Sequence, residues 1–232
     1  MKKQRDLVRP SLLDPYYIEG MGRVRALRKI LNEKFSENSV SFSTSHPALL
    51  LDLGGRESPY EELVRGLPIR WLSVDMKKYM RTEVRGDAEA LPFKEGEFDG
   101  VLCTQVLGYV KHLDHAVGEI YRVLKPEGVA ILTEAAVFPP WGEGARWRIL
   151  PEGWKTLLEK FSTVEVDADC KTVASFFRIA NLYLAIILQD IPIVETLWRL
   201  SLCPAFNMIG RWANERFKDT GFAANYIVVA RK

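Results

Sequence analysis

Short apolar segments alternate with amphipathic ones from residue 48 onward, and this alternation constrains the fold more than any other feature. Strands are expected at 49–53, 69–75, 98–103 and 129–133. A helix is expected at 114–124, because its apolar residues recur at helical spacing. Short apolar strands separated by such helices predict an α/β fold with a mostly parallel sheet, covered on both faces.

The rest of the chain adds elements around this sheet. Helices are expected at 15–36, 59–65 and 151–160, a strand at 164–166, very apolar helices at 172–218, and a last strand at 223–229. We therefore expect an N-terminal helical extension (1–46) before one domain (47–232). A helical insertion, at about 170–220, would precede the last strand.

Composition excludes several classes of protein. The 232 residues include 32 basic and 30 acidic ones, so the net charge of +2 gives no reason to expect a nucleic-acid partner. The three cysteines and three histidines have no metal-binding spacing, so no metal site is expected. Reduced thiols and an N-terminus without an apolar core predict a cytoplasmic protein. The longest apolar stretch, 173–188, is interrupted by Arg178 and is too short to predict a membrane span.

The stretch LLLDLGG, residues 49–55, predicts a buried strand that ends in a tight turn. Gly54 and Gly55 allow a close approach of the backbone to a ligand, or a positive φ. Residues 58–61 (SPYE) fit a capping box with proline at the first helical position, so a helix N-terminus is expected to follow the turn.

This turn fits neither of two common nucleotide-binding motifs. The dinucleotide pattern G-x-G-x-x-G fails at its second and third glycines, and the Gly-Lys-Ser/Thr of a phosphate-binding loop is absent. Two interpretations remain open at this point. The turn holds a ligand without a pyrophosphate, or it is an ordinary strand–helix connection.

Polar residues at the ends of other strands favour the ligand. Asp75 follows the second strand and could accept both hydroxyls of a ribose. Gly86-Asp87-Ala88 would place a carboxylate and a backbone N–H beside an adenine edge. Thr104 ends the next strand, and the carboxyl ends of parallel strands are where such sheets bind ligands.

Together these segments resemble a class I S-adenosylmethionine-dependent methyltransferase of the small-molecule, menaquinone- and ubiquinone-methyltransferase-like branch. The stretches that carry the resemblance are LLLDLGG, LSVD, GDAEALPF, FDGVLCTQVLGYV and AVGEIYRVLKPEGVAIL, within residues 48–135. The resemblance implies a Rossmann-like sheet with an antiparallel last strand and S-adenosylmethionine across the strand ends. The residues expected to bind this cofactor are Asp52, Gly54, Gly55, Arg56, Asp75, Met76, Asp87, Ala88, Thr104 and Gln105.

The chain departs from the family pattern at two places. Arg56 and Ser58 stand where the family has its second and third glycines, and Gly108-Tyr109 stands where it often has Glu-His. Arg56 could clasp the methionine carboxylate, or it could fill the methionine pocket. The alternative to an enzyme is therefore a non-catalytic protein that serves as a partner or scaffold.

Methyl transfer from a sulfonium requires mainly that the acceptor be held in line, so a general base is optional. If a base exists, Tyr109, His112 and Glu143 are the candidates. The expected acceptor is a small molecule, lipid- or glycan-related. The apolar insertion has three interpretations: packing in a core, which its apolar residues on more than one helical face favour, a homodimer surface, or contact with a lipid-like acceptor or membrane.

Overall fold

The protein is described by a computed structural model that gives the structure of residues 6–36, 43, 45–138, 144–219 and 221–232. The chain divides into two compact units. The first unit comprises residues 1–26, 136–139 and 168–225, and the second comprises residues 27–135, 140–167 and 226–232. The expected boundary between residues 46 and 47 stays a prediction.

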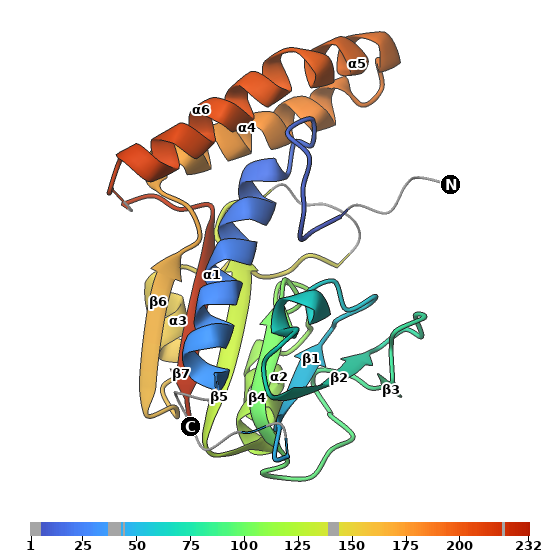
Figure 1. The fold of residues 1–232 in the computed structure, drawn as a ribbon, viewed down its shortest axis with the longest axis vertical. Coiled ribbons are helices and arrows are strands. Elements are labelled where there is room, and N and C mark those ends of the chain that lie inside the picture. The colour runs from blue at the N-terminus through green and yellow to red at the C-terminus, as the bar shows by residue number, and fades with distance from the viewer. Residues whose placement is uncertain (1–5, 37–42, 44, 139–143, 220) are drawn as a thin grey trace. The chain divides into compact units, whose positions relative to one another are not determined.

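A seven-stranded sheet in the order β3-β2-β1-β4-β5-β7-β6 forms the centre of the second unit (Figure 1). The strands are β1 (Ala48–Leu53), β2 (Ile69–Asp75), β3 (Val84–Arg85), β4 (Phe98–Thr104), β5 (Leu124–Ala135), β6 (Thr163–Ala168) and β7 (Asn225–Arg231). β1 pairs in parallel with β2 and β4, β2 with β3, and β4 with β5. Because Leu53 lies opposite both Val74 and Cys103, the carboxyl ends of these strands meet at one edge.

The last strand runs against its neighbours. The backbone N–H of Lys232 donates to the carbonyl of Gly128 at 3.0 Å, and that of Ala136 donates to Ala224 at 3.0 Å. Partner numbers fall along β7 as they rise along β5, which is the antiparallel pattern. The Rossmann-like sheet with an antiparallel last strand is therefore confirmed.

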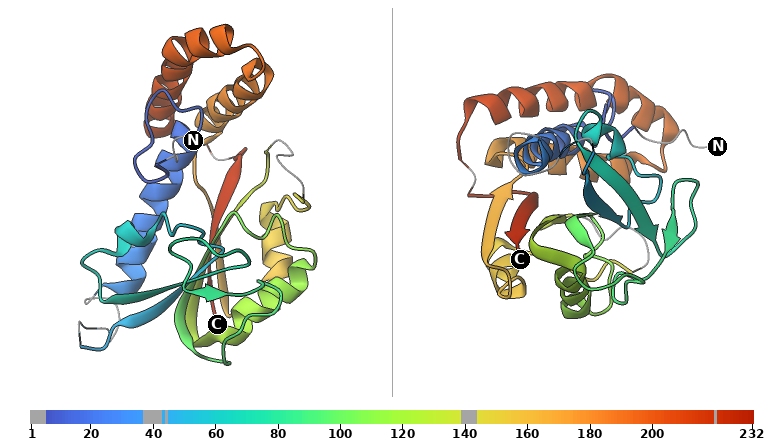
Figure 2. Two further views of the ribbon diagram at one scale, coloured as in Figure 1. Left: turned by 90° about the vertical axis from the view of Figure 1, so that its right-hand side faces the viewer. Right: turned by 60° about the horizontal axis from the view of Figure 1, so that its bottom comes forward.

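Helices cover both faces of this sheet (Figure 2). On one face, α2 (Leu113–Val123) and α3 (Pro151–Leu157) bury Ile120 and Trp154 in a core shared with the strands. On the other face lie residues 27–35 of α1 (Tyr17–Phe35). A Cβ on Gly100 of β4 would come within 2.6 Å of the Phe35 ring, so this glycine lets the helix approach the sheet.

The first unit consists mainly of helices: the start of α1, then α4 (Thr172–Leu188), α5 (Pro192–Leu200) and α6 (Leu202–Arg216). Fully buried Arg178 of α4 forms ion pairs with Asp169 at 3.1 Å and with Glu19 of α1 at 3.2 Å. Glu19 also accepts a hydrogen bond from Arg23 at 2.5 Å. Burial raises the pKa of Asp169, and the Arg178 charge opposes that rise. This network of opposite charges connects three segments of the first unit.

The predicted helix at 59–65 is wrong. Only a short 3₁₀ helix, η1 (Glu61–Val64), follows the turn, and its N-cap, Tyr60, makes no side-chain hydrogen bond to it. Ser58 cannot act as the expected cap, because it has a φ of +45° inside the turn and its buried hydroxyl has no hydrogen-bond partner among the described residues. The helical capping box therefore does not form.

The helical insertion forms as predicted, but its packing differs from the favoured interpretation. Leu182 is buried, whereas Phe176 and Ile187 are about two-thirds exposed. Much of the apolar surface of α5 and α6 is likewise exposed. Among the described residues, no helix is both long and apolar enough to span a bilayer.

Candidate functional site

The turn after β1 keeps the backbone shape of a glycine-rich loop although it has only two glycines. Gly54 has a φ of +74°, and a Cβ there would lie 2.3 Å from Val106 Cγ2. Arg56 and Ser58 also have positive φ values, +48° and +45°. These two residues occupy the places of the missing family glycines. Such a conformation costs a residue with a side chain on the order of 1 kcal/mol or more.

Asp52 lies beneath this turn and is completely buried. A Cβ on Gly55 would be 2.0 Å from Asp52 Oδ2, so only glycine leaves room for the carboxyl group. Ser58 and Trp71 face this group and lower its pKa, yet neither carboxyl oxygen has a hydrogen bond of good geometry among the described residues. A buried acid without partners is costly when ionised.

Burial is the main reason that the pKa of Asp52 rises to about 7, and the negative charges of Asp75 and Glu61 add to the rise. Asp52 can therefore keep its proton at a pH at which an ordinary aspartate is ionised. A cation bound above the turn would favour the ionised form. The protonation state of Asp52 therefore depends on the charge of the ligand that binds above the turn.

Asp75 joins β2 to the same turn. Its Oδ2 accepts a hydrogen bond from the Arg56 backbone N–H at 3.2 Å, and its Oδ1 accepts one from the Lys77 N–H at 2.9 Å. The carboxylate is partly exposed, and each oxygen has a second lone pair. Asp75 can therefore order the turn and still accept hydrogen bonds from a ligand. Met76, the next residue, is 59% exposed.

The segment that follows β3 returns to the end of β2. The Gly86 N–H donates to the Asp75 carbonyl at 3.0 Å, which brings Asp87 and Ala88 to this edge of the sheet. Asp87 is exposed, and its Oδ1 accepts a hydrogen bond from the Glu89 N–H at 3.0 Å. Ala88 is buried. The second and third predicted binding segments are thus neighbours in space.

Thr104 and Gln105 begin the loop after β4. Gln105 has a φ of +58°, and its N–H donates to the Thr133 carbonyl at 2.9 Å. Its side-chain amide donates to Thr133 Oγ1 at 3.3 Å. Hydrogen bonds to Thr133 of β5 therefore fix the start of this loop. The loop also lies close to the turn after β1, because Val106 packs next to Gly54.

Sequence analysis missed one acidic residue of this edge, Glu134 at the end of β5. It is 2% exposed, and its Oε2 accepts a hydrogen bond from the Gly108 N–H at 2.7 Å. A Cβ on Gly108 would lie 2.9 Å from Glu134 Oε1, so the glycine makes room for the carboxylate. The family often has an acidic residue at position 108, whereas here β5 supplies a carboxylate beside it. The signal in the sequence was a single acid at the end of the apolar stretch VAILTEA.

The candidate bases lie on the outer part of the same loop. Tyr109 is 45% exposed, and its carbonyl accepts a hydrogen bond from Arg146 at 3.1 Å. His112 is exposed at the N-cap of α2, where its backbone N–H donates to Glu89 at 3.1 Å. Glu143 lies outside the described residues. No catalytic role is tested for any of the three.

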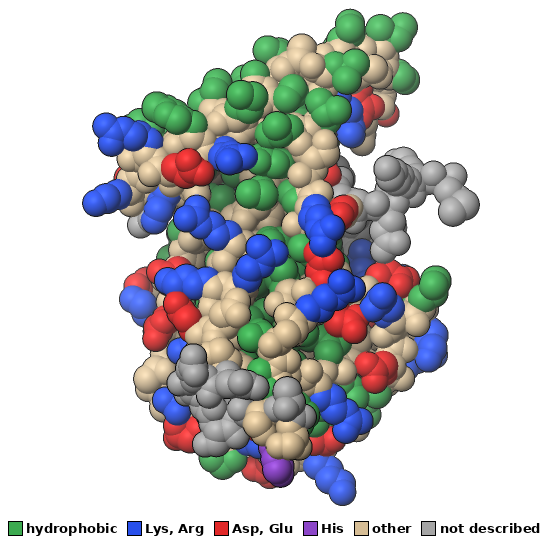
Figure 3. Space-filling view, viewed as in Figure 1, with side chains coloured by type: hydrophobic (Ala, Val, Ile, Leu, Met, Phe, Trp, Pro, Cys, Tyr) green, Lys and Arg blue, Asp and Glu red, His purple; other side chains and the backbone are tan. Residues whose placement is uncertain are grey.

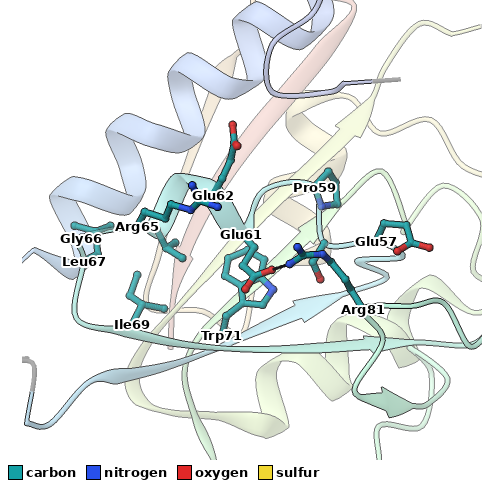
Figure 4. A pocket seen from close by; sticks show the side chains of 12 residues that line it. Glu57, Pro59, Glu61, Glu62, Arg65, Gly66, Leu67, Ile69, Trp71 and Arg81 are labelled. Carbon is teal, nitrogen blue, oxygen red and sulfur yellow. Dashed lines mark hydrogen bonds and ion pairs between the residues drawn. The ribbon is translucent and has the colours of Figure 1, made fainter. Parts of the chain in front are cut away.

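A pocket of about 570 Å³ adjoins the turn on the side of η1 and β2 (Figure 4). Ser58 belongs to its wall, the Trp71 ring stands in its centre, and the ion pair of Arg81 with Glu61 lies across it. Neither Asp75 nor Asp87 lines this pocket, so it is distinct from the predicted cofactor site. Among the described residues, no group of three His, Cys, Asp or Glu side chains could hold a metal ion.

The structure thus brings the predicted residues of the turn, of the end of β2 and of the loops after β3 and β4 to one edge of the sheet. Their role in binding a cofactor stays a prediction.

Similarity to known proteins indicates the family to which part of this sequence is related. Residues 51–132 match the family model described as "Methyltransferase domain".

Curated relatives match parts of the chain. A demethylmenaquinone methyltransferase of Thermus thermophilus is 40% identical over 83 residues, which cover 35% of this chain and 30% of that protein. A phthiotriol/phenolphthiotriol dimycocerosates methyltransferase of Mycobacterium ulcerans is 35% identical over 86 residues, covering 37% and 30%. A mitochondrial arginine-hydroxylase of Danio rerio is 30% identical over 142 residues, covering 56% and 42%. The chain therefore spans less than half the length of these relatives.

Solved structures share the fold over most of the chain. Phosphoethanolamine N-methyltransferase 2 of Haemonchus contortus, in complex with S-adenosyl-L-methionine, has a TM-score of 0.56 at 15% identity and covers 95% of this chain and 56% of that one. The cyclase SpnF has a TM-score of 0.57 at 20% identity, covering 92% and 81%. At such identities the likeness concerns the fold. Residues 51–132 are thus similar to the methyltransferase domain family, and the chain shares the fold of these solved structures.

Proposed function

We propose that the protein is an S-adenosylmethionine-dependent methyltransferase that acts on a small molecule. The observation that supports this most directly is the hydrogen bond from the Arg56 N–H to Asp75, which unites two motifs 19 residues apart in one site. The turn lets a ligand approach the backbone closely, and Asp75 offers it a carboxylate with free lone pairs. This is the combination that a nucleoside with a charged tail requires.

The residues of the site fit S-adenosylmethionine. Asp75 would accept hydrogen bonds from the ribose hydroxyls, and Asp87 with Ala88 would face the adenine. The turn at Gly54 and Gly55 would receive the methionine end, above the buried carboxyl group of Asp52. Met76, Thr104 and Gln105 complete the set of proposed cofactor-binding residues. The fold neighbour from Haemonchus contortus is a complex with this molecule, which supports the assignment.

Bound S-adenosylmethionine supplies a methyl group on a positively charged sulfur, so the donor is already activated. The chain's own residues then have to hold the acceptor in line and exclude water. The loop 105–110, held by Thr133 and Glu134, would orient the acceptor beside the turn. A general base is needed only if the acceptor atom carries a proton, and Tyr109, His112 and Glu143 remain the candidates.

The names of the relatives favour a lipid-related acceptor. Three of these relatives are methyltransferases named for demethylmenaquinone, 2-phytyl-1,4-naphtoquinone and phthiotriol dimycocerosates. We propose an acceptor of this quinone- or lipid-related class, with a glycan-related acceptor as the second candidate. Cytoplasmic location, peripheral membrane contact and a homodimer are further proposals.

The alternative is a non-catalytic protein of the same fold, or one with another chemistry. The cyclase SpnF and the arginine-hydroxylase among the matches indicate that similar chains carry other activities. Arg56 in the turn is the feature of this chain that favours the alternative.

Turnover separates these candidates. The protein would be incubated with S-adenosylmethionine and short-chain demethylmenaquinol, and formation of S-adenosylhomocysteine and of methylated quinol would be followed by chromatography. We expect both products in equal amounts, and at least tenfold less of each from the Asp75→Ala variant when the cofactor concentration is limiting. The control is Asp167→Ala, which removes an exposed aspartate from β6. Cofactor binding without turnover on quinol or glycan acceptors would favour the non-catalytic alternative.

A further inference from the structure

The helical unit exposes an unusual amount of apolar surface. Thirteen of the 22 large hydrophobic side chains that are exposed among the described residues lie between Phe176 and Phe217. Figure 3 shows such side chains gathered over α5 and along α6. Folded monomers rarely leave large apolar patches to water, so this surface is a candidate for contact with a partner.

The densest part of the surface is a stretch of twelve residues that we call the α5 tip. Its exposed members are aliphatic, and their exposed fractions range from 42% to 77%: Ile191, Ile193, Val194, Leu197, Leu200 and Leu202. Ile193, Leu197 and Leu200 are spaced by four and three residues, so they share one face of α5. The tip therefore presents a continuous aliphatic ridge.

The charges of α5 cancel one another. Glu195 and Arg199, its only charged residues, form an ion pair at 2.8 Å. A pair of this kind costs less to move into a medium of low polarity than two separate charges would. The tip can therefore leave water without carrying a net charge.

The chemistry of the tip favours lipid over a second protein chain. Stable protein interfaces depend on Trp, Tyr and Arg anchors at their centre. Trp198, the aromatic residue of α5, is only 4% exposed and packs inward against Ala185 and Cys203. The exposed ridge offers only aliphatic side chains, which match acyl chains rather than a specific pocket.

Basic residues accompany this surface. The sequence of the first unit holds 12 Lys and Arg against 8 Asp and Glu, with three of the 12 (positions 2, 3 and 5) outside the described residues, whereas the rest of the chain holds 20 against 22. The helical unit is thus net positive although the protein is almost neutral. Arg211 and Arg216 of α6 and Lys218 just after it are exposed, as are Glu215 and Asp219, which leaves one net positive charge in this segment. Such a distribution complements the negative surface of a bilayer with anionic lipids.

We infer that the helical unit docks on an anionic lipid bilayer, with the α5 tip inserted among the acyl chains and the basic residues of α6 near the phosphates. Among the described residues, no helix is both long and apolar enough to span the bilayer, so the proposed contact is interfacial. The inference goes beyond the proposed activity and does not depend on it. If both hold, docking brings the enzyme to the phase in which a lipid-like acceptor is dissolved.

Vesicle binding tests this docking without cofactor or acceptor. The full chain would be sedimented with phosphatidylcholine vesicles that contain phosphatidylglycerol, and in parallel with phosphatidylcholine alone. We expect tighter binding to the anionic vesicles. Ile193→Ser with Leu197→Ser should weaken binding by about tenfold or more for each side chain. The matched control, Met80→Ser with Leu150→Ser, removes two exposed apolar side chains from the other unit and should bind as the natural protein does.

A fluorescent probe reports insertion directly. It gives a positive signal, whereas loss of binding could also result from misfolding of a variant. All three natural cysteines are buried, so a dye will label an introduced surface cysteine selectively. A polarity-sensitive dye on Leu197→Cys should shift to the blue when anionic vesicles are added, and the same dye on Met80→Cys should not. Absence of vesicle binding overturns the inference, as does an unshifted Leu197→Cys probe. A natural protein that is dimeric in solution, together with a monomeric Ile193→Ser, Leu197→Ser variant, would identify a second copy as the partner and likewise overturn it.

Discussion

Asp52 makes a strong prediction about the pH dependence of stability. The structure raises its pKa from 3.8 to about 7, chiefly because the carboxyl group is buried. In the unfolded chain the group has an ordinary pKa, so between these two values the native state binds more protons than the unfolded state. The contribution of Asp52 to stability is therefore fully present below pH 3.8 and is lost as the pH rises through about 7.

The magnitude follows from the size of this shift. Each pKa unit corresponds to about 1.4 kcal/mol, so a shift of about three units amounts to roughly 4 kcal/mol between the acid and the alkaline limits. Asp52→Asn has nearly the same shape and cannot ionise. We expect it to be more stable than the natural protein by as much as this amount at pH 9 and nearly equal to it at pH 4.

Urea unfolding at several pH values measures this effect. The quantity of interest is the difference in unfolding free energy between the variant and the natural protein, because the pH dependence of other groups cancels in it. Asp167→Asn, an exposed aspartate of β6, is the control and should give a difference near zero throughout. A difference for Asp52→Asn that does not grow with pH would refute the reasoning, because Asp52 would then not be a strained buried acid.

Three further substitutions test other parts of the structure. Arg178→Met should lower the unfolding free energy by about 3–5 kcal/mol, because it leaves the buried carboxyl group of Asp169 without its ion-pair partner and Glu19 with Arg23 as its ion-pair partner, and urea unfolding will measure the loss. Arg56→Gly should raise stability by about 1 kcal/mol, since glycine tolerates the positive φ, and calorimetry on this variant will show whether the arginine clasps the cofactor or obstructs it. Gly108→Ala should lower stability by about 1–3 kcal/mol, because its Cβ displaces the Glu134 carboxylate from its hydrogen bond; unchanged stability would mean that the loop moves freely.

The strands of the sheet could be predicted from the sequence, whereas the conformation of the turn after β1 could not. The strand at 69–75 was predicted with the bounds that the structure has, because its apolar residues lie between clear turn signals. Residues 58–61 misled the prediction because SPYE fits a capping box locally, whereas Ser58 has a positive φ and belongs to the turn in the structure. Local propensity does not predict that a serine adopts this backbone conformation.

Two other features depended on three-dimensional context. Glu134 lies far in sequence from Gly108. Neither segment alone could therefore show that the glycine leaves room for the Glu134 carboxylate. The helices at 172–218 were predicted from their apolar residues, but periodicity does not reveal which apolar residues lack a covering partner. Exposure of Ile193 and its neighbours became evident only from the structure.

The proposed function requires that the turn and Asp75 bind S-adenosylmethionine. Isothermal titration calorimetry of the natural protein with this cofactor measures that binding. We expect saturable binding of one molecule per chain, weakened by about 1.5–3 kcal/mol in Asp75→Ala and unchanged in Asp167→Ala. Absence of binding at millimolar cofactor, or equal affinity in Asp75→Ala, would contradict it.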